Sequence, residues 1–469
     1  MSRLRRRVLP PRRPAAAAAG LLALLAGVGP LGAQTAPAAG GRGRSEPAAT
    51  TARSAVAPGP GFAFPGTLAD TLDPVERRIA AAAAARAEEA VAFLQRVVDV
   101  NSGTGNALGV REVGRLFRQR LDSLGFATRW VTPAHAAPRA GHLFAERDGG
   151  PGRRVLLIGH LDTVYELGDP FQRFVRTDSA ARGPGTIDAK GGAVALLYAL
   201  VALRDAGVLD GARVVVGLMG DEETPAHPFE TSRAELLAEA RRSDAALAFE
   251  PAANGTIGAA TPVRLGFAGW RLRVPIDAGG RAARSEAIAR ATALVRDFRQ
   301  LAVGEPNFEV YPVGAREEAE DGAPGGGDAA GSAAPAVVVE GGIRAAETRQ
   351  LQQAERGMRE RAAAARGEVR LDFDADPYPG MPARPENFAL LRALDAVSRA
   401  LGDGPVVAGD PSKRGGGDIS FVGALVPGLD GLGPAGGGAH SPQETVDLRS
   451  LAAATRRAAV LVYRLTRGG

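Results

Sequence analysis

The sequence of 469 residues contains no cysteine, only two lysines, Lys190 and Lys413, and only five histidines. The absence of cysteine excludes a disulfide scaffold, thiolate metal ligands, a cysteine nucleophile and a lipidated N-terminal cysteine. A metal site in this chain must therefore be built from nitrogen and oxygen ligands, mainly imidazoles and carboxylates.

The first 33 residues have the pattern of an export signal. Six arginines precede an apolar stretch from Ala15 to Gly29, and Leu31-Gly32-Ala33 offers small residues before a cleavage at Gln34. The apolar run of about 15 residues is shorter than the roughly 20 that a membrane-spanning helix needs. We therefore expect a periplasmic or secreted protein without a stable membrane anchor. The pair Arg6-Arg7 leaves both the general secretory and the twin-arginine route open.

Removal of this signal changes the charge balance of the chain. Residues 1–33 hold six arginines and no acid, so the rest carries 51 Lys and Arg against 52 Asp and Glu. The net charge falls from +5 to −1. A balanced chain of this kind gives no support for nucleic-acid binding, because such proteins need a basic surface.

Apolar runs and helical periodicity alternate along much of the chain. Residues 34–75, rich in Ala, Pro and Gly, predict a disordered linker. Helical periodicity begins at Glu76, and three short apolar runs of buried-strand type follow, separated by helical segments: Arg154–Ile158, Ala212–Met219 and Ala245–Phe249. Buried strands that alternate with helices predict a layered α/β sheet.

The pattern of apolar and polar residues changes between residues 263 and 376. Strand-like and helical stretches in the order β-α-β-β predict a small α+β domain, inserted between the two parts of a larger domain at residues 76–262 and 377–469. Residues 314–335, rich in Gly, Ala, Asp and Glu, predict a mobile loop within this insertion.

Histidine and carboxylate residues follow the three predicted strands. His160 and Asp162 follow the first strand, Glu222 and Glu223 follow the second, and Glu250 ends the third. Side chains two apart in an extended chain point the same way, so Asp162 can orient His160 through its second ring nitrogen. The alternative interpretation of Glu222 and Glu223 is an acidic loop exposed to solvent.

Two glycine-rich segments add Asp188 and His440. Taken singly, Asp188 could cap the following helix and His440 could be an exposed loop residue. Together with the strand-end residues they supply two imidazoles and three or four carboxylates. Such ligands suit Zn²⁺, or Mn²⁺ and Co²⁺, and their number suits two metals about 3.5–4 Å apart that share a carboxylate.

Five motifs carry a resemblance to a known family. They are Gly-His-Leu-Asp-Thr-Val (159–164), Gly-x-x-Asp-x-Lys-Gly (185–191), Gly-Asp-Glu-Glu (220–223), Phe-Glu-Pro (249–251) and Gly-Gly-Gly-Ala-His-Ser (436–441). In order and spacing they resemble the M20 metallopeptidases, the group of glutamate carboxypeptidase, acetylornithine deacetylase, succinyl-diaminopimelate desuccinylase and aminoacylase. The resemblance runs from about residue 84 to the C-terminus. It implies a zinc-exopeptidase-like three-layer α/β/α catalytic domain with an inserted ferredoxin-like lid that commonly dimerises.

The resemblance also implies a metal centre. Asp188 is expected to bridge two divalent ions, most readily Zn²⁺. His160 and Glu250 complete one coordination sphere, and Glu223 and His440 complete the other.

Further residues receive roles from the same resemblance. Glu222 is the expected general base, which takes a proton from the attacking water and passes it to the leaving amine. Asp162 orients His160. Lys413 or Arg414 could meet a substrate carboxylate.

The predicted lid departs from the family. Relatives carry a Gly-x-x-x-His motif whose histidine stabilises the oxyanion, often across a dimer, but this chain has Gly280 to Arg284 there and no histidine between His227 and His440. Either the histidine is lost from a shortened or divergent lid, or Arg284 replaces it. Arg344 could contact a substrate carboxylate.

The function predicted from these residues is cleavage of an amide bond in a small peptide or an N-acyl amino acid by a metallopeptidase or deacylase. Because the lid of this family commonly dimerises, a homodimer is a candidate assembly. The alternative is a catalytically weak homologue that binds metal as a periplasmic binding protein. The missing lid histidine favours this alternative, whereas the retained Glu222 argues against it. His135, His142 and His227 fit no ligand position and are expected to be structural or on the surface.

Overall fold

The computed structural model describes residues 71–134, 139–318 and 335–467. The predicted export signal, nearly all of the predicted linker, His135 and most of the predicted 314–335 loop lie outside these ranges. None of the described helices combines the length and the apolar character that crossing a membrane requires.

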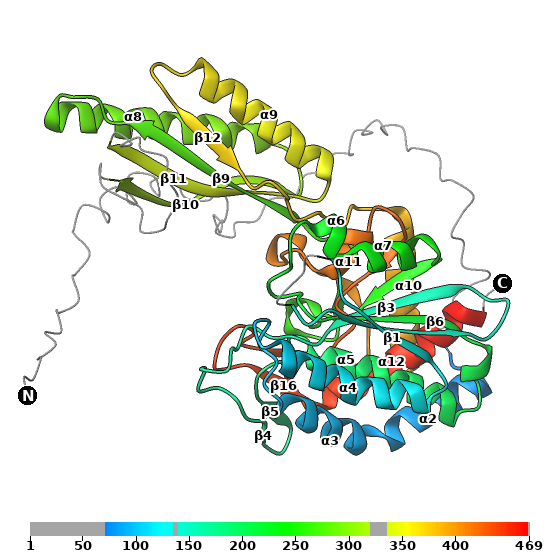
Figure 1. Cartoon of the computed structure of the whole chain (residues 1–469). Coiled ribbons are helices and arrows are strands. Elements are labelled where there is room, and N and C mark those ends of the chain that lie inside the picture. The colour runs from blue at the N-terminus through cyan, green and yellow to red at the C-terminus, as the bar shows by residue number, and fades with distance from the viewer. Residues whose placement is uncertain (1–70, 135–138, 319–334, 468–469) are drawn as a thin grey trace, which may run out of the picture.

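The large domain is built on a six-stranded sheet in the order β1-β2-β6-β3-β7-β14 (Figure 1). Strands β6, β3, β7 and β14 are parallel, and β1 and β2 are antiparallel to their neighbours. The strands span Ala127–Val131 (β1), His142–Asp148 (β2), Arg154–His160 (β3), Arg213–Met219 (β6), Ala245–Ala248 (β7) and Gly428–Leu429 (β14).

Helices cover both faces of this sheet. The larger layer packs with one set of strand side chains and consists of α2 (Pro74–Ala85), α3 (Ala87–Val98), α4 (Ala107–Ser123), α5 (Lys190–Asp205), α10 (Pro385–Ala400) and α12 (Leu448–Arg467). The opposite face holds α6 (Phe229–Ser232), α7 (Ala234–Arg241) and α11 (Asp418–Val422). The predicted three-layer α/β/α architecture is therefore confirmed.

The apolar run Val155–Ile158 in strand β3 is explained by burial on both faces of the sheet. Val155 and Leu157 belong to the core on one face, and Leu156 and Ile158 belong to the core on the other. A strand in the middle of a parallel sheet is buried on both faces, so its central residues Val155–Ile158 are all apolar, whereas Arg154 and His160 at its ends are buried polar residues.

The helical pattern from Glu76 to Val98 is divided into two helices at Arg86. Helix α2 begins with a capping box in which Asp73 and Glu76 each accept from the other's backbone N–H. The side chain of Arg86 is held by the nearby Glu89 and by Asp205, and the local pattern does not contain the second of these contacts.

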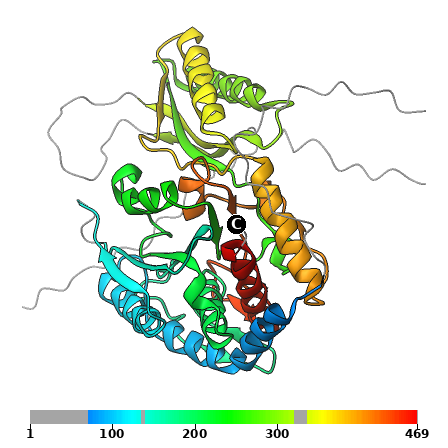
Figure 2. The same ribbon diagram turned by 90° about the vertical axis from the view of Figure 1, so that its right-hand side faces the viewer.

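The small domain is a four-stranded antiparallel sheet in the order β10-β11-β9-β12, with two helices on one face (Figures 1 and 2). Its elements follow as β9 (Gly266–Pro275), α8 (Gly280–Arg299), β10 (Phe308–Glu318), β11 (Ala336–Ala345), α9 (Thr348–Ala364) and β12 (Arg370–Phe373). This is the α+β insertion that the resemblance implied. Trp270, Leu272, Phe298 and Val339 are among its core residues.

One expectation for this domain is wrong. Residues 314–318 belong to β10 rather than to a loop, and they pair with residues 336–340 of β11 after a register shift between Pro312 and Gly314. Because Arg316 and Glu318 are charged, this end of the strand lacks the apolar pattern by which a strand is predicted from sequence. They bond to each other on the exposed face of the sheet, where charge is tolerated.

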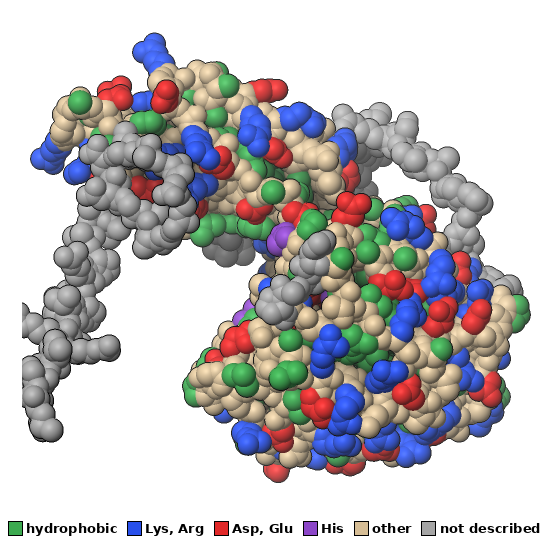
Figure 3. Space-filling model, viewed as in Figure 1, with side chains coloured by type: hydrophobic (Ala, Val, Ile, Leu, Met, Phe, Trp, Pro, Cys, Tyr) green, Lys and Arg blue, Asp and Glu red, His purple; other side chains and the backbone are tan. Residues whose placement is uncertain are grey.

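Two smaller sheets complete the large domain. Strands β15 (Gly436–Gly437), β16 (Thr445–Asp447), β5 (Ala180–Arg182) and β4 (Val175–Arg176) form one, and β13 (Val407–Ala408) pairs with β8 (Ala259–Ala260) in the other. The surface is hollowed between the large and small domains (Figure 3).

Candidate metal centre

The ends of three neighbouring parallel strands place four of the predicted residues at one edge of the main sheet. His160 is the last residue of β3, Glu222 and Glu223 follow β6, and Glu250 follows β7. Carboxyl ends of parallel strands meet at the same edge, where sites of α/β proteins gather.

The first ligand group consists of His160, Asp188 and Glu250, whose ligand atoms lie within 4.8 Å of one another. Nε2 of His160 lies 3.3 Å from Oδ1 of Asp188 and 3.6 Å from Oε1 of Glu250. Burial raises the pKa of Glu250 to about 8, so this carboxylate needs a neighbouring cation to be ionised at neutral pH.

The second group consists of Asp188, Glu223 and His440. Nε2 of His440 lies 3.2 Å from Oδ2 of Asp188 and 3.1 Å from Oε2 of Glu223. Hydrogen bonds to these two carboxylates raise the pKa of His440 to about 11. Asp188 therefore offers one oxygen to each group, as a bridging carboxylate does.

The residues present fit two divalent cations. Oε1 of Glu223 is buried without a hydrogen-bond partner among the described residues, which is the situation of an oxygen that awaits a ligand. The set of imidazoles and carboxylates, with one carboxylate common to both groups, suits Zn²⁺ and similar ions at a two-metal site.

Asp162 lies against Nδ1 of His160, with its backbone oxygen nearer to that nitrogen than the carboxylate that the spacing predicted. Nδ1 of His160 lies 3.1 Å from the backbone oxygen of Asp162 and 3.4 Å from its Oδ1. Because Nδ1 is occupied in this way, Nε2 faces the ligand group.

The carboxylate of Asp162 also holds the acidic loop after β6. It accepts the backbone N–H groups of Glu222 at 3.0 Å and of Glu223 at 3.1 Å, and the hydroxyl of Thr104 at 2.7 Å. Burial opposes ionisation of Asp162, but hydrogen bonding to His160 and Thr104 lowers its pKa. Sequence reasoning missed Thr104, which has no motif around it.

Arg233 fixes the same loop from the other side, and sequence reasoning missed it too. Its side chain is 0% exposed. It donates to Asp221 Oδ1 at 2.7 Å and to Asp418 Oδ1 at 2.8 Å. Asp418 is the first residue of α11 and Arg233 directly precedes α7, and no sequence motif marks Arg233 in this arginine-rich chain.

Glu222 belongs to neither ligand group. Burial and the negative charge of Glu250 raise its pKa well above that of an ordinary glutamate. A carboxylate beside the ligands with a raised pKa has the properties of a group that accepts and returns a proton.

A cavity of about 280 Å³ opens beside Asp188 and is lined by Lys413 and Arg414 as well. Arg344 of the small domain donates to the backbone oxygens of Ser412 at 2.9 Å and of Arg414 at 2.7 Å. The guanidinium of Arg344 therefore holds the loop that carries the two cations.

The structure does not bring Arg284 to the ligand groups. Arg284 lies in the first turns of α8, is 57% exposed, and pairs with Glu317 of β10 at 3.1 Å. Both residues belong to the small domain.

The remaining described histidines lie away from the ligand groups. His142 is buried, with Nε2 3.0 Å from the backbone oxygen of Ser232, and its Nδ1 accepts the backbone N–H of Gly220. His227 is exposed and lies 3.1 Å from Asp376.

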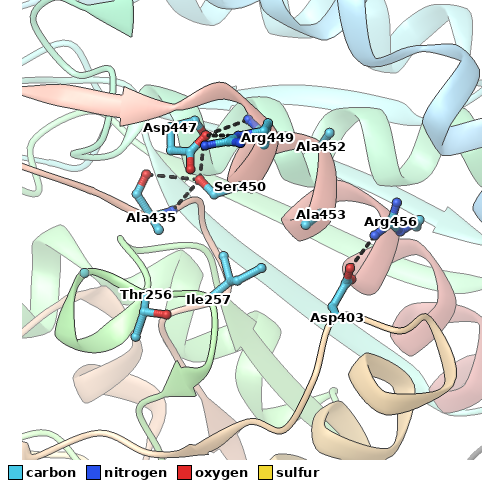
Figure 4. A pocket seen from close by; sticks show the side chains of 11 residues that line it. Thr256, Ile257, Asp403, Ala435, Asp447, Arg449, Ser450, Ala452, Ala453 and Arg456 are labelled. Carbon is cyan, nitrogen blue, oxygen red and sulfur yellow. Dashed lines mark hydrogen bonds and ion pairs between the residues drawn. The ribbon is translucent and has the colours of Figure 1, made fainter. Parts of the chain in front are cut away.

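A second cavity, of about 580 Å³, shares Gly255 with the first (Figure 4). The pairs Asp403–Arg456 and Asp447–Arg449 line it. The residues predicted from sequence for the metal centre are not among its lining residues.

Comparison with known proteins adds to this geometry. The model of peptidase family M20/M25/M40 matches residues 156–464. Carboxypeptidase G2 of Pseudomonas sp. (strain RS-16) is 33% identical over 165 residues, which are 34% of this chain and 38% of that protein.

Solved structures show the same fold. A tripeptidase from Staphylococcus aureus superposes with a TM-score of 0.63 at 17% identity, covering 81% of this chain and 99% of that one. A dinuclear metal-binding M20 peptidase from Bacillus subtilis gives 0.56 at 15% identity, covering 81% and 98%. An M20 metallo-carboxypeptidase from Sulfolobus solfataricus gives 0.57 at 14% identity, covering 81% and 99%.

Proposed function

The chain belongs to peptidase family M20/M25/M40, and from this membership we propose that it is a two-metal hydrolase that cleaves an amide bond of a small peptide or an N-acyl amino acid. The observation that carries the proposal is the position of Asp188, which has one carboxylate oxygen beside His160 and the other beside His440. A binding site for a single ion has no need of a second histidine on the far side of the shared carboxylate.

His160, Asp188 and Glu250 are the proposed ligands of one ion, and Asp188, Glu223 and His440 those of the other, with Zn²⁺ as the preferred metal. Such a pair of ions supplies a water of lowered pKa and polarises the scissile carbonyl. Glu222 takes the proton from the attacking water and delivers it to the leaving amine. Asp162 keeps Glu222 in place through its backbone N–H.

The cavity beside Asp188 supports the proposal that the substrate carries a carboxylate. Lys413 and Arg414 place two cations at its wall, and the volume of about 280 Å³ suits a small group. The likeness to a carboxypeptidase over part of the chain supports the same class. We propose that the carboxylate beside the scissile bond is held there, which a C-terminal peptidase and an N-acyl-amino-acid deacylase share.

The decisive experiment measures metal content and hydrolysis together. Wild type and Glu222→Gln are loaded with Zn²⁺, Mn²⁺ or Co²⁺ and assayed on dipeptides and N-acyl amino acids, each with its C-terminal amide as control. We expect two ions in both proteins, a loss of roughly 10²–10⁴-fold in hydrolysis for the variant, and discrimination against the amides. Two bound ions without metal-dependent hydrolysis in wild type would establish the alternative, a binding protein.

We also propose export and a homodimer. Residues 1–33 support the former, and cleavage before Gln34, read by N-terminal sequencing of the periplasmic or secreted protein, tests it. Strand β10 lies at the edge of the small domain's sheet and can pair with a second copy. Light scattering of the purified protein measures the mass, and a monomer at micromolar concentration contradicts the dimer.

A further inference from the structure

His440 is held by its loop rather than by packing of its own side chain. The side chain is 57% exposed, and the backbone has a φ of 60°, a left-handed conformation that non-glycine residues rarely adopt. Whatever anchors residues 438–444 therefore decides where this imidazole lies.

Glu444 joins that loop to the loop that carries Asp188. Its backbone N–H donates to the oxygen of Ser441 at 2.9 Å, and its backbone oxygen accepts from Gly183 at 3.3 Å. The hydroxyl of Tyr165 donates to the oxygen of Ser441 at 2.8 Å. The backbone of Glu444 thus bonds to both segments, at Ser441 one residue from His440 and at Gly183 five residues from Asp188.

The side chain of Glu444 reaches Asp188 itself. It is 0% exposed, and Oε1 accepts the backbone N–H groups of Ile187 at 2.9 Å and of Asp188 at 3.1 Å. A buried carboxylate is costly unless it is hydrogen-bonded. These two bonds orient the peptide units on either side of the Cα of Ile187, and with them the start of the Asp188 side chain.

A buried cation offers a second reason for an acid at this position. Lys190 is fully buried, and its Nζ donates to the backbone oxygen of Val100 at 3.0 Å. Oε2 of Glu444 is buried and has no hydrogen-bond partner among the described residues. Burial lowers the pKa of Lys190, and the negative charge of Glu444 raises it. Charge compensation of Lys190 and orientation of Asp188 are thus two separable roles for one carboxylate.

We propose that Glu444 is a positioning residue that sets the distance between Asp188 and His440, and that it thereby determines the affinity of the second ion. The inference rests on the proposed two-metal function. The first group depends less on these loops, because His160 ends a central strand and Glu250 follows β7. The second group contains His440, whose loop Glu444 anchors.

Two variants of Glu444 test the length of its side chain and its negative charge separately. Glu444→Asp keeps the charge but shortens the side chain by one carbon–carbon bond, so it cannot span to both N–H groups. Glu444→Gln keeps the reach and an accepting oxygen but removes the charge. Glu166→Asp is the matched control, because Glu166 also accepts a backbone N–H, from Gly105 at 2.8 Å, outside the two ligand groups.

Zn²⁺ stoichiometry and stepwise affinity of the full-length mature chain are measured by elemental analysis and titration calorimetry, and circular dichroism of the metal-free proteins checks folding. We expect two ions in wild type, Glu444→Gln and Glu166→Asp. In Glu444→Asp the second ion should bind 10–100-fold more weakly, the range typical when a residue that supports a metal ligand is altered, while the affinity for the first ion, which also uses Asp188, falls less.

Wild-type affinity for both ions in folded Glu444→Asp would overturn the proposal. Loss of the second ion in Glu444→Gln would also overturn it, because that variant retains the reach. This second outcome decides the question even if Glu444→Asp does not fold. Fewer than two ions in wild type would refute the proposed function itself, which keeps the two failures distinguishable.

Discussion

The carboxylate of Asp162 accepts the backbone N–H of Glu222 at 3.0 Å. The same carboxylate accepts from Glu223 and lies against the ring of His160. One buried side chain therefore sets the relative positions of a ligand on β3, a ligand after β6 and the proposed general base. This is a wider role than orienting a single histidine.

Asp162→Asn should impair both metal binding and turnover. The amide has one accepting oxygen instead of two, and its NH₂ group faces a donor that the carboxylate had satisfied. We expect 10–100-fold weaker metal binding and a fall in kcat, measured by calorimetry and steady-state kinetics. Thr104→Val is the matched control, since it removes the hydroxyl bond to Asp162 and leaves both backbone bonds. An equal loss in Thr104→Val would contradict the importance of the backbone bonds.

Arg233→Met should destabilise the fold strongly. The change leaves Asp221 and Asp418 buried without their cation, and breaking a buried pair on one side costs about 3–5 kcal/mol. Urea unfolding of the metal-free protein measures the free energy of unfolding. Arg296→Met is the control, because Arg296 forms an exposed pair with Asp297 at 3.6 Å, and such pairs contribute about 0–1 kcal/mol. Similar losses in the free energy of unfolding of the two variants would refute the stabilising role assigned to the contacts of Arg233 with Asp221 and Asp418.

His142 should make the free energy of unfolding depend on pH below neutrality. Burial lowers the pKa of His142 to about 4, whereas an unfolded chain has a histidine pKa of about 6.5. Between these values the unfolded chain binds a proton that the folded protein does not, so stability is complete above about pH 6.5 and falls as the pH drops toward 4.

The loss over this window is about 3 kcal/mol for the single group. Urea unfolding of the metal-free protein between pH 4.5 and 7.5 measures it, as the difference between wild type and His142→Gln. His227→Gln serves as control, because His227 is 60% exposed. Parallel pH curves for wild type and His142→Gln would show that His142 does not titrate in this way.

Arg284→Ala should leave kcat within about twofold of wild type. The guanidinium pairs with Glu317 inside the small domain, so the structure gives it no place at the ligand groups of its own chain. Loss of an oxyanion donor costs about 10²–10³-fold in kcat, which steady-state kinetics on the best substrate of the panel would detect. A fall of that size would instead give Arg284 the role of the absent histidine.

Much of the fold and of the metal centre could be predicted from the sequence, because apolar runs and short motifs are local features of the chain. An unbroken apolar run such as Val155–Ile158 is typical of a strand buried on both faces, and the residues that end such a strand lie at the sheet edge. His160, Glu223 and Glu250 are placed by that rule alone. The fold class and the family followed from these runs and from five motifs.

Only the tertiary structure decided what supports these residues. Glu444 meets Ile187 across 257 positions, and Arg233 meets Asp418 across 185. Contacts over such separations leave no periodicity or spacing in the chain, because each partner is an ordinary residue among its own neighbours. The same holds for the bond between Arg86 and Asp205, 119 positions apart, and for the pairing of residues 314–318 with β11. The chemistry of the ligands is thus a property of the sequence, whereas their positions depend on partners that folding alone brings near.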